Sequence, residues 1–310
     1  MRKSLIVITT LFIAPLAVLA QGAALPQTEE FIFRFQPPDG TIVRQTYKFE
    51  RMRTIEGQPS TRDEAETVTE GRFRRVGDGF EYSPKIISST LRRNGTAIND
   101  PISELLSKVQ VIYVISKGAE ATEIRGFGEV AQMVKSTMPA QLAAALAPVL
   151  NESSLVAQQK AEWNARYSDF ADGTFKIGDV IDVQAPQRLP NGETINYTIR
   201  TSFPSWEPCP AGTCIRIKQI YESDAAELAK LVDGVVGSVI RSATGSQTAP
   251  KVEKDATRIT GSLSRLIDPK TMLIYAEQVK RTISMRVQLP GQGTLPTVQE
   301  ESRTYTYTYQ

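Results

Sequence analysis

Apolar and polar residues alternate along two long portions of the chain, and this alternation predicts β-strands. In the first portion it covers Phe31–Phe35, Thr41–Arg53, Glu66–Val76 and Phe80–Leu91, with turn residues between these segments. A period of two residues sends successive side chains to opposite faces of a strand. Gly77-Asp78-Gly79 favours a tight hairpin turn. We therefore expect the first portion to form an antiparallel meander.

Helical spacing replaces the alternation in the middle of the chain. Helices are predicted over Gly128–Met138 and Ala140–Leu150, where apolar residues recur every three or four positions. A further helix is expected to begin at a cap formed by Ser153 or Ser154. It would place one stripe of large side chains on a single face: Trp163, Tyr167 and Phe170. We interpret these stripes as packing surfaces.

Alternation returns near Thr174 and continues to the end of the chain, with one helical interruption. The first segment, Phe175–Val183, contains the turn string KIGD. The strands predicted after it are Gly192–Pro204, Ile215–Tyr221, Ala256–Ile267 and Met272–Val287. The interruption is a predicted apolar helix over Asp224–Arg241. The last residues, Thr304–Tyr309, alternate threonine and tyrosine, which predicts a strand inside a sheet. Because short turns link most neighbouring strands, we expect an α+β fold with a mainly antiparallel sheet.

The predicted organisation is a signal peptide at residues 1–20 followed by a single domain at 21–310. Within that domain, two β-rich halves at about 28–125 and 172–310 flank a helical segment at 126–170. The two halves have a similar order of elements, so one hypothesis is that they arose by duplication of one half. The sequence contains no residue-level repeat.

The N-terminus has the three parts of a secretory signal. Arg2 and Lys3 precede an apolar run at Leu5–Leu19, and Val18 and Ala20 occupy the −3 and −1 positions of a cleavage site. The run is short for crossing a membrane, which takes about 20 residues. We expect cleavage near Ala20 and a secreted or periplasmic protein that is soluble, with no membrane span after signal removal.

Charge and composition narrow the classes of function. The chain has 36 Lys and Arg against 34 Asp and Glu, so it lacks the positive field that holds nucleic acid. It contains no histidine, which excludes Ser-His-Asp and Cys-His nucleophiles and histidine metal sites. We find no catalytic, cofactor-binding or metal-binding motif, predict no cofactor, and expect a protein that is not an enzyme.

The two cysteines, Cys209 and Cys214, lie in the string PCPAGTC. A lone close pair in an exported chain favours a disulfide, and its position predicts a staple at a hairpin tip. A redox pair would usually separate its thiols by two residues instead of four.

Three strings carry a resemblance to known proteins: ATEIRGFGEVAQMV, FKIGDVIDV and GSLSRLIDPKTMLIYAEQV. They resemble secreted bacterial proteins of uncharacterised-domain families, with a turn at Gly178-Asp179 and another from Asp268 to Thr271. The order of elements over residues 40–310 is similar to the LolA/LolB half-barrel of periplasmic lipoprotein carriers and to mycobacterial lipid-binding lipoproteins. This likeness implies a curved, half-barrel-like sheet with amphipathic helices packed on one face.

Such a fold leaves two main functions open. The first is a structural or protein-interaction role in the cell envelope, with an envelope protein as partner. The second is a periplasmic carrier that binds a lipid or another apolar small molecule in a crevice between sheet and helices. The expected crevice residues belong to the two apolar helices: Leu142, Leu146, Leu228, Val232, Val235 and Val239. An enzyme is a third, less supported hypothesis.

Overall fold

The computed structural model describes residues 30–99, 104, 107–137, 151–188, 194–229, 251–252, 257–289 and 293–310. The predicted signal peptide, the predicted helix at 140–150 and most of the one at 224–241 lie outside these ranges. In the described ranges, no helix is long and apolar enough to cross a membrane.

The described residues place thirteen strands in one sheet, which joins both β-rich portions of the chain. The predicted meander is confirmed, because β2 (Ile42–Ile55), β3 (Thr61–Val76) and β4 (Gly79–Arg93) pair in sequence order. Beyond β4 the sheet continues with β6 (Ile112–Ile115) and β7 (Ala121–Arg125), and the short β5 (Thr96–Ile98) pairs with β4.

The second β-rich portion pairs onto the other side of β2. The C-terminal strand β15 (Gly293–Tyr309) lies between β2 and β14 (Ile274–Leu289), so it is central, as predicted. From β14 the order continues to the edge: β13 (Arg258–Ile267), β11 (Gly212–Ser223), β10 (Thr194–Cys209) and β9 (Val180–Arg188). A two-residue strand, β12 (Lys251–Val252), also pairs with β14.

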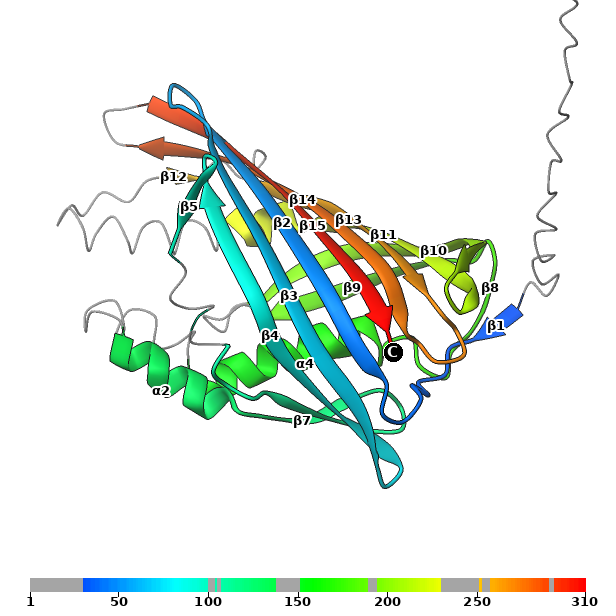
Figure 1. Ribbon diagram of the computed structural model, residues 1–310. Coiled ribbons are helices and arrows are strands. Elements are labelled where there is room, and N and C mark those ends of the chain that lie inside the picture. Colours follow the sequence, from blue (N-terminus) through cyan, green and yellow to red (C-terminus); the bar gives the residue numbers. More distant parts are fainter. Residues whose placement is uncertain are drawn as a thin grey trace, which may run out of the picture.

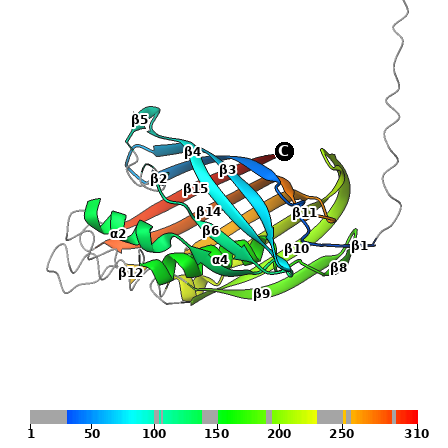
Figure 2. The same ribbon diagram turned by 60° about the horizontal axis from the view of Figure 1, so that its bottom comes forward.

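The sheet is curved and open, and every pairing in it is antiparallel. Its strand order ends at β7 on one side and β9 on the other, and these two described strands do not pair. Figures 1 and 2 show the strands curving around the side on which α4 (Glu152–Arg166) lies. We call this side the inner face. On β15, Tyr307 is buried on the inner face, whereas Thr306 and Thr308 are exposed on the outer face.

Two of the predicted helices are present in the described residues, α2 (Phe127–Thr137) and α4. The predicted serine cap of α4 is wrong. Asn151 caps the helix, because its side-chain oxygen accepts a hydrogen bond from the Ser154 backbone N–H at 2.9 Å. The predicted packing role of Trp163 is confirmed, since it is buried and donates to the Ala119 carbonyl at 2.8 Å.

The Phe31–Phe35 segment forms a strand only over β1 (Glu30–Ile32), which pairs with β8 (Thr174–Lys176). The longer predicted strand is wrong because the following backbone groups bond to two different loops. Phe33 N–H donates to the Gly173 carbonyl at 3.3 Å, and Arg34 N–H donates to the Pro269 carbonyl at 2.8 Å.

The turn expected at Gly178-Asp179 is present and divides the segment Phe175–Val183 into β8 and β9. Gly178 lies between them with φ +92°, a left-handed conformation that ends the extended run.

A cluster of aromatic rings fills one end of the inner face. Rings from β10 and from the segments around α4 meet the phenylalanines of the first segment there, and Phe175 and Phe203 have centroids 4.7 Å apart. We call this cluster the aromatic plug: Phe31, Phe33, Phe35, Trp163, Tyr167, Phe170, Phe175 and Phe203. Burial of so many rings stabilises this end of the sheet.

A buried ion-pair triad joins α4 to the sheet beside the aromatic plug. Glu277 on β14 accepts from Arg265 Nε at 2.6 Å and from Arg166 Nη2 at 2.9 Å. The side chain of Glu277 is 1% exposed and that of Arg265 is 3% exposed. Burial alone would raise the pKa of Glu277, but the two guanidinium charges outweigh it and lower that pKa.

The predicted disulfide is confirmed. Cys209 and Cys214 are bonded across the hairpin between β10 and β11. Nearby, Trp206 packs on the core, with its ring edge-on to Phe31 at a centroid distance of 5.5 Å. Trp206 therefore covers the hairpin.

Replacing Glu277 should destabilise the protein strongly. We expect Glu277→Gln to lower the free energy of unfolding by about 3–5 kcal/mol, because it leaves the buried guanidinium group of Arg265 and the half-buried one of Arg166 without their counter-charge. Chemical denaturation would measure this change. The matched control is Glu300→Gln on the exposed outer face of β15, which should alter stability by less than about 0.5 kcal/mol. Equal losses in the two variants would contradict this role for the triad.

Candidate functional site

The structure describes one of the six predicted crevice residues, Leu228. It lies in a helical stretch at 225–229, whose first turn is capped by Asp224 accepting from the Glu227 N–H at 2.9 Å. Leu228 is buried in one cluster with Ile195 and Ile259. The other five lie outside the described residues: Leu142, Leu146, Val232, Val235 and Val239. The crevice as a whole therefore stays a prediction.

A row of alternating charges crosses the inner face over five neighbouring strands. Its members are directly opposed in the strand registers of β4, β3, β2, β15 and β14. We call it the charged row: Arg93, Asp63, Arg51, Glu301 and Arg281. Opposite charges on facing positions of adjacent strands stabilise a sheet.

The two acids of the charged row are each held by two arginines. Asp63 accepts from Arg93 Nε at 2.7 Å and from Arg51 Nη2 at 2.5 Å. Glu301 accepts from Arg281 Nη2 at 2.7 Å and from Arg303 Nη2 at 3.2 Å. Both acids are buried, at 7% exposure. The row is thus a built network of charge-assisted hydrogen bonds.

These contacts determine how the two acids titrate. Burial by itself would raise the pKa of Asp63, but hydrogen bonds from Arg93 and Arg51 outweigh it, so that pKa is lowered. The pKa of Glu301 is lowered in the same way, because the charge of Arg281 and its hydrogen bond outweigh the effect of burial. Both side chains are therefore ionised at neutral pH.

Arginines outnumber acids around the charged row. Arg303 and Arg53 lie beside it on the same face of β15 and β2, which brings five arginines to two carboxylates in this region. Arg53 donates to Gln299 Oε1 at 3.0 Å. Within the described part of the chain, Arg53 makes no ion pair. The inner face around the row therefore has a net charge of about +3, from five guanidinium groups less two carboxylates.

An apolar strip runs parallel to the charged row on the same face, two residues further along each strand toward the aromatic plug. Its residues follow the registers of five strands and are half-buried: Leu91, Ala65, Phe49, Val279 and Leu263. Arg303 shares this position on β15, between Phe49 and Val279. The guanidinium groups of Arg51 and Arg303 each lie 5.9 Å from the Phe49 ring centroid. Positive charge and apolar surface thus adjoin on one face.

This arrangement suits non-covalent binding of a molecule with an anionic group and an apolar body. Guanidinium groups bind carboxylate and phosphate through paired hydrogen bonds, and aliphatic and aromatic side chains bind the apolar part. In the part of the chain that the structure describes, no group of three His, Cys, Asp or Glu side chains is placed to hold a metal ion.

The comparisons with known proteins give no family for this chain. No family model matches it, and no curated protein matches it. The similarity to a LolA/LolB-type half-barrel is therefore not confirmed.

Several solved structures share weak likeness with the chain. A structure of lipovitellin, described for its lipid–protein interactions, matches 88% of this chain with 9% identity and a TM-score of 0.45, and this chain spans 25% of its length. A lipoprotein candidate from Parabacteroides distasonis matches 87% of this chain and 96% of its own, with 9% identity and a TM-score of 0.25. An outer membrane channel from Pseudomonas putida matches 92% of this chain and 100% of its own, with 8% identity and a TM-score of 0.17. At these scores the likenesses carry no functional conclusion.

The charged row should make the free energy of unfolding depend on pH in the acidic range. Because the pKa values of Asp63 and Glu301 are lowered by folding, their stabilisation is complete above the ordinary carboxyl range near pH 4 and is lost as the pH falls below it. We expect Asp63→Asn/Glu301→Gln to have a shallower fall in unfolding free energy between about pH 5 and 2 than the unmodified protein.

Urea unfolding at several pH values would measure these slopes. Glu300→Gln serves as the control and should keep the slope of the unmodified protein. A double variant with an unchanged slope would show that these acids are not paired in solution.

Proposed function

We propose that this chain is an exported binding protein that holds an amphipathic anion, such as a fatty acid or an anionic lipid, against the inner face of its sheet. The observation that carries the proposal is the charged row with its excess of arginines beside the half-buried apolar strip. The anionic group would bind at the arginines and the apolar body along the strip. In this proposal the predicted apolar helical segments cover the ligand.

Two features of the structure support this assignment. The sheet is open, and among the described residues the one other sheet is the short pair β1–β8 (Figure 2). The aromatic plug and α4 occupy one end of that face, whereas the charged row lies toward the other end of β3 and β4. The apolar strip lies between these two regions, and its side chains are not fully buried.

A protein-interaction role is the second candidate, and the edge strand β9 favours it. This strand ends the sheet and pairs only with β10 among the described strands. Its apolar residues Val180, Ile181 and Val183 are 57%, 37% and 45% exposed. An unpaired apolar edge can add a strand from a partner chain.

Binding of a fatty acid should depend on Arg53. With delipidated protein and cis-parinaric acid as a fluorescent probe, we expect Arg53→Gln to weaken binding about tenfold, because a charge-assisted hydrogen bond contributes about 1.5–3 kcal/mol. Palmitate should displace the probe at least tenfold better than 1-hexadecanol, which has the same chain without the charge.

Arg44→Gln is the matched control, since Arg44 lies on the exposed outer face of the same strand. It should bind the probe like the unmodified protein. Absence of probe binding, equal displacement by the acid and the alcohol, or equal loss in both arginine variants would refute the proposal.

The edge-strand role predicts a different result. A lysine at the exposed edge, in Val183→Lys, should abolish co-purification with an envelope partner and leave probe binding unchanged. Val76→Lys, at a residue that is 46% exposed on the β3–β4 hairpin, is the control and should retain the partner. Retention of the partner by Val183→Lys would exclude the β9 edge as the interaction surface.

A further inference from the structure

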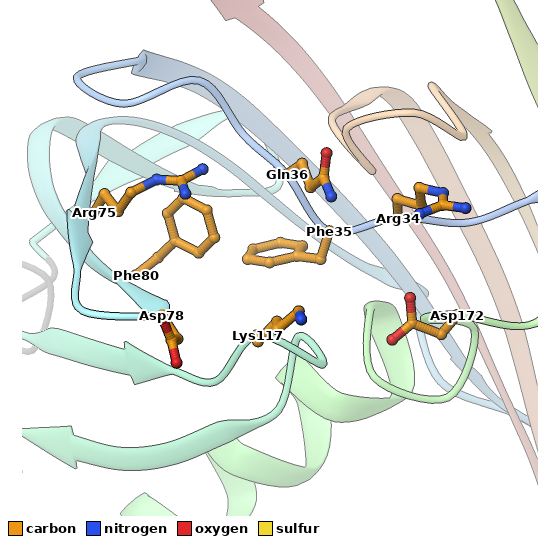
Figure 3. A pocket seen from close by; sticks show the side chains of 8 residues that line it. All are labelled: Arg34, Phe35, Gln36, Arg75, Asp78, Phe80, Lys117 and Asp172. Carbon is orange, nitrogen blue, oxygen red and sulfur yellow. The ribbon is translucent and has the colours of Figure 1, made fainter.

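A pocket of about 570 Å³ opens beside the aromatic plug, at the end of β3 and β4 opposite to the charged row. Its walls come from segments far apart in the sequence: residues 34–36, the hairpin between β3 and β4, the turn between β6 and β7, and Asp172 (Figure 3). Sites for small molecules usually have volumes of about 300–1,000 Å³. This pocket is large enough for one.

Two buried rings form an apolar surface in the pocket. Phe35 and Phe80 have centroids 5.5 Å apart in an edge-to-face arrangement, and each is 4% exposed. Phe35 also contacts Phe73 and Trp163, so the core holds its ring in place. The small exposed area of these rings is therefore rigid and can contact the apolar part of a ligand.

Three cationic side chains line the same pocket, namely Arg34, Arg75 and Lys117. In the part of the chain that the structure describes, none of them makes an ion pair. The backbone orients two of them, since Arg34 N–H donates to the Pro269 carbonyl at 2.8 Å and Arg75 N–H donates to Asp39 Oδ1 at 2.7 Å. The Arg75 guanidinium lies 5.2 Å from the Phe80 ring centroid.

Two acids, Asp78 and Asp172, also line the pocket, but neither carboxylate lies against the two aromatic rings. Figure 3 shows the Asp78 carboxylate pointing away from Phe35 and Phe80, and Asp172 on the side of Arg34. The same view shows the Lys117 ammonium group beneath the Phe35 ring. The pocket therefore presents Arg75 and Lys117 on either side of the aromatic surface.

We infer that this pocket binds a small organic anion, whose flat apolar part lies on Phe35 and Phe80 and whose phosphate or carboxylate group is held by Arg75 and Lys117. With three cations against two acids the pocket carries a net positive charge, and none of the cations makes an ion pair with another described residue, so an anion would be attracted to it. The site is separate from the inner-face rows, because the aromatic plug fills the space between them.

Isothermal titration calorimetry on the full chain at low salt would test this inference, with phenyl phosphate as the probe. We expect phenyl phosphate to bind more tightly than inorganic phosphate, which lacks the ring, and more tightly than benzyl alcohol, which lacks the charge. Lys117→Gln should weaken phenyl phosphate binding at least tenfold. Lys117 is exposed in a turn, so this change should leave the fold intact.

Lys85→Gln is the matched control, because Lys85 is exposed on the outer face of β4. It should bind phenyl phosphate like the unmodified protein. Saturating cis-parinaric acid should leave phenyl phosphate affinity unchanged. No binding of phenyl phosphate, equal losses in the two lysine variants, or competition between the two probes would overturn the inference. Failure of cis-parinaric acid to bind would count against the proposed function alone.

Discussion

The position of α4 over the sheet depends on one buried carboxylate. Glu277 neutralises two guanidinium groups at once, that of Arg265 on the neighbouring strand and that of Arg166 at the end of the helix. Arg265 also donates to the Arg166 carbonyl at 2.8 Å, which ties the helix backbone to the same point. Because an unpaired buried charge costs several kcal/mol, these three side chains are stable only together. They hold the helix where Trp163 enters the aromatic plug.

The inner face is divided by chemistry along the strands. Toward the plug, rings from distant segments are buried and pack in edge-to-face and tilted pairs. Toward the other end, the arginines pair across strands with Asp63 and Glu301. Both acids, Asp63 and Glu301, are paired with arginines of neighbouring strands, and the arginines outnumber them, so this region has a net positive charge. That excess, next to Phe49 and its apolar neighbours, distinguishes this region from an ordinary core.

The two proposed sites have different physical bases. The inner-face site uses guanidinium groups already fixed by acids, so a ligand would share a preorganised network. The pocket at the plug uses cations that make no ion pair among the described residues, beside rings that the core holds rigid. One protein can carry both, because the plug separates them and each takes its residues from different strand ends.

Local pattern alone determined most of the strands and turns, the α2 helix and the Cys209–Cys214 bridge, because alternation, turn residues and a short cysteine spacing are properties of neighbouring residues. Tertiary structure decided the rest. The sequence does not show that Arg51 would face Glu301, since strand register brings together residues 250 positions apart. For the same reason the triad at Glu277, the plug and the pocket could not be predicted. The split of the Phe31–Phe35 strand also depended on distant loops, which competed for its backbone hydrogen bonds.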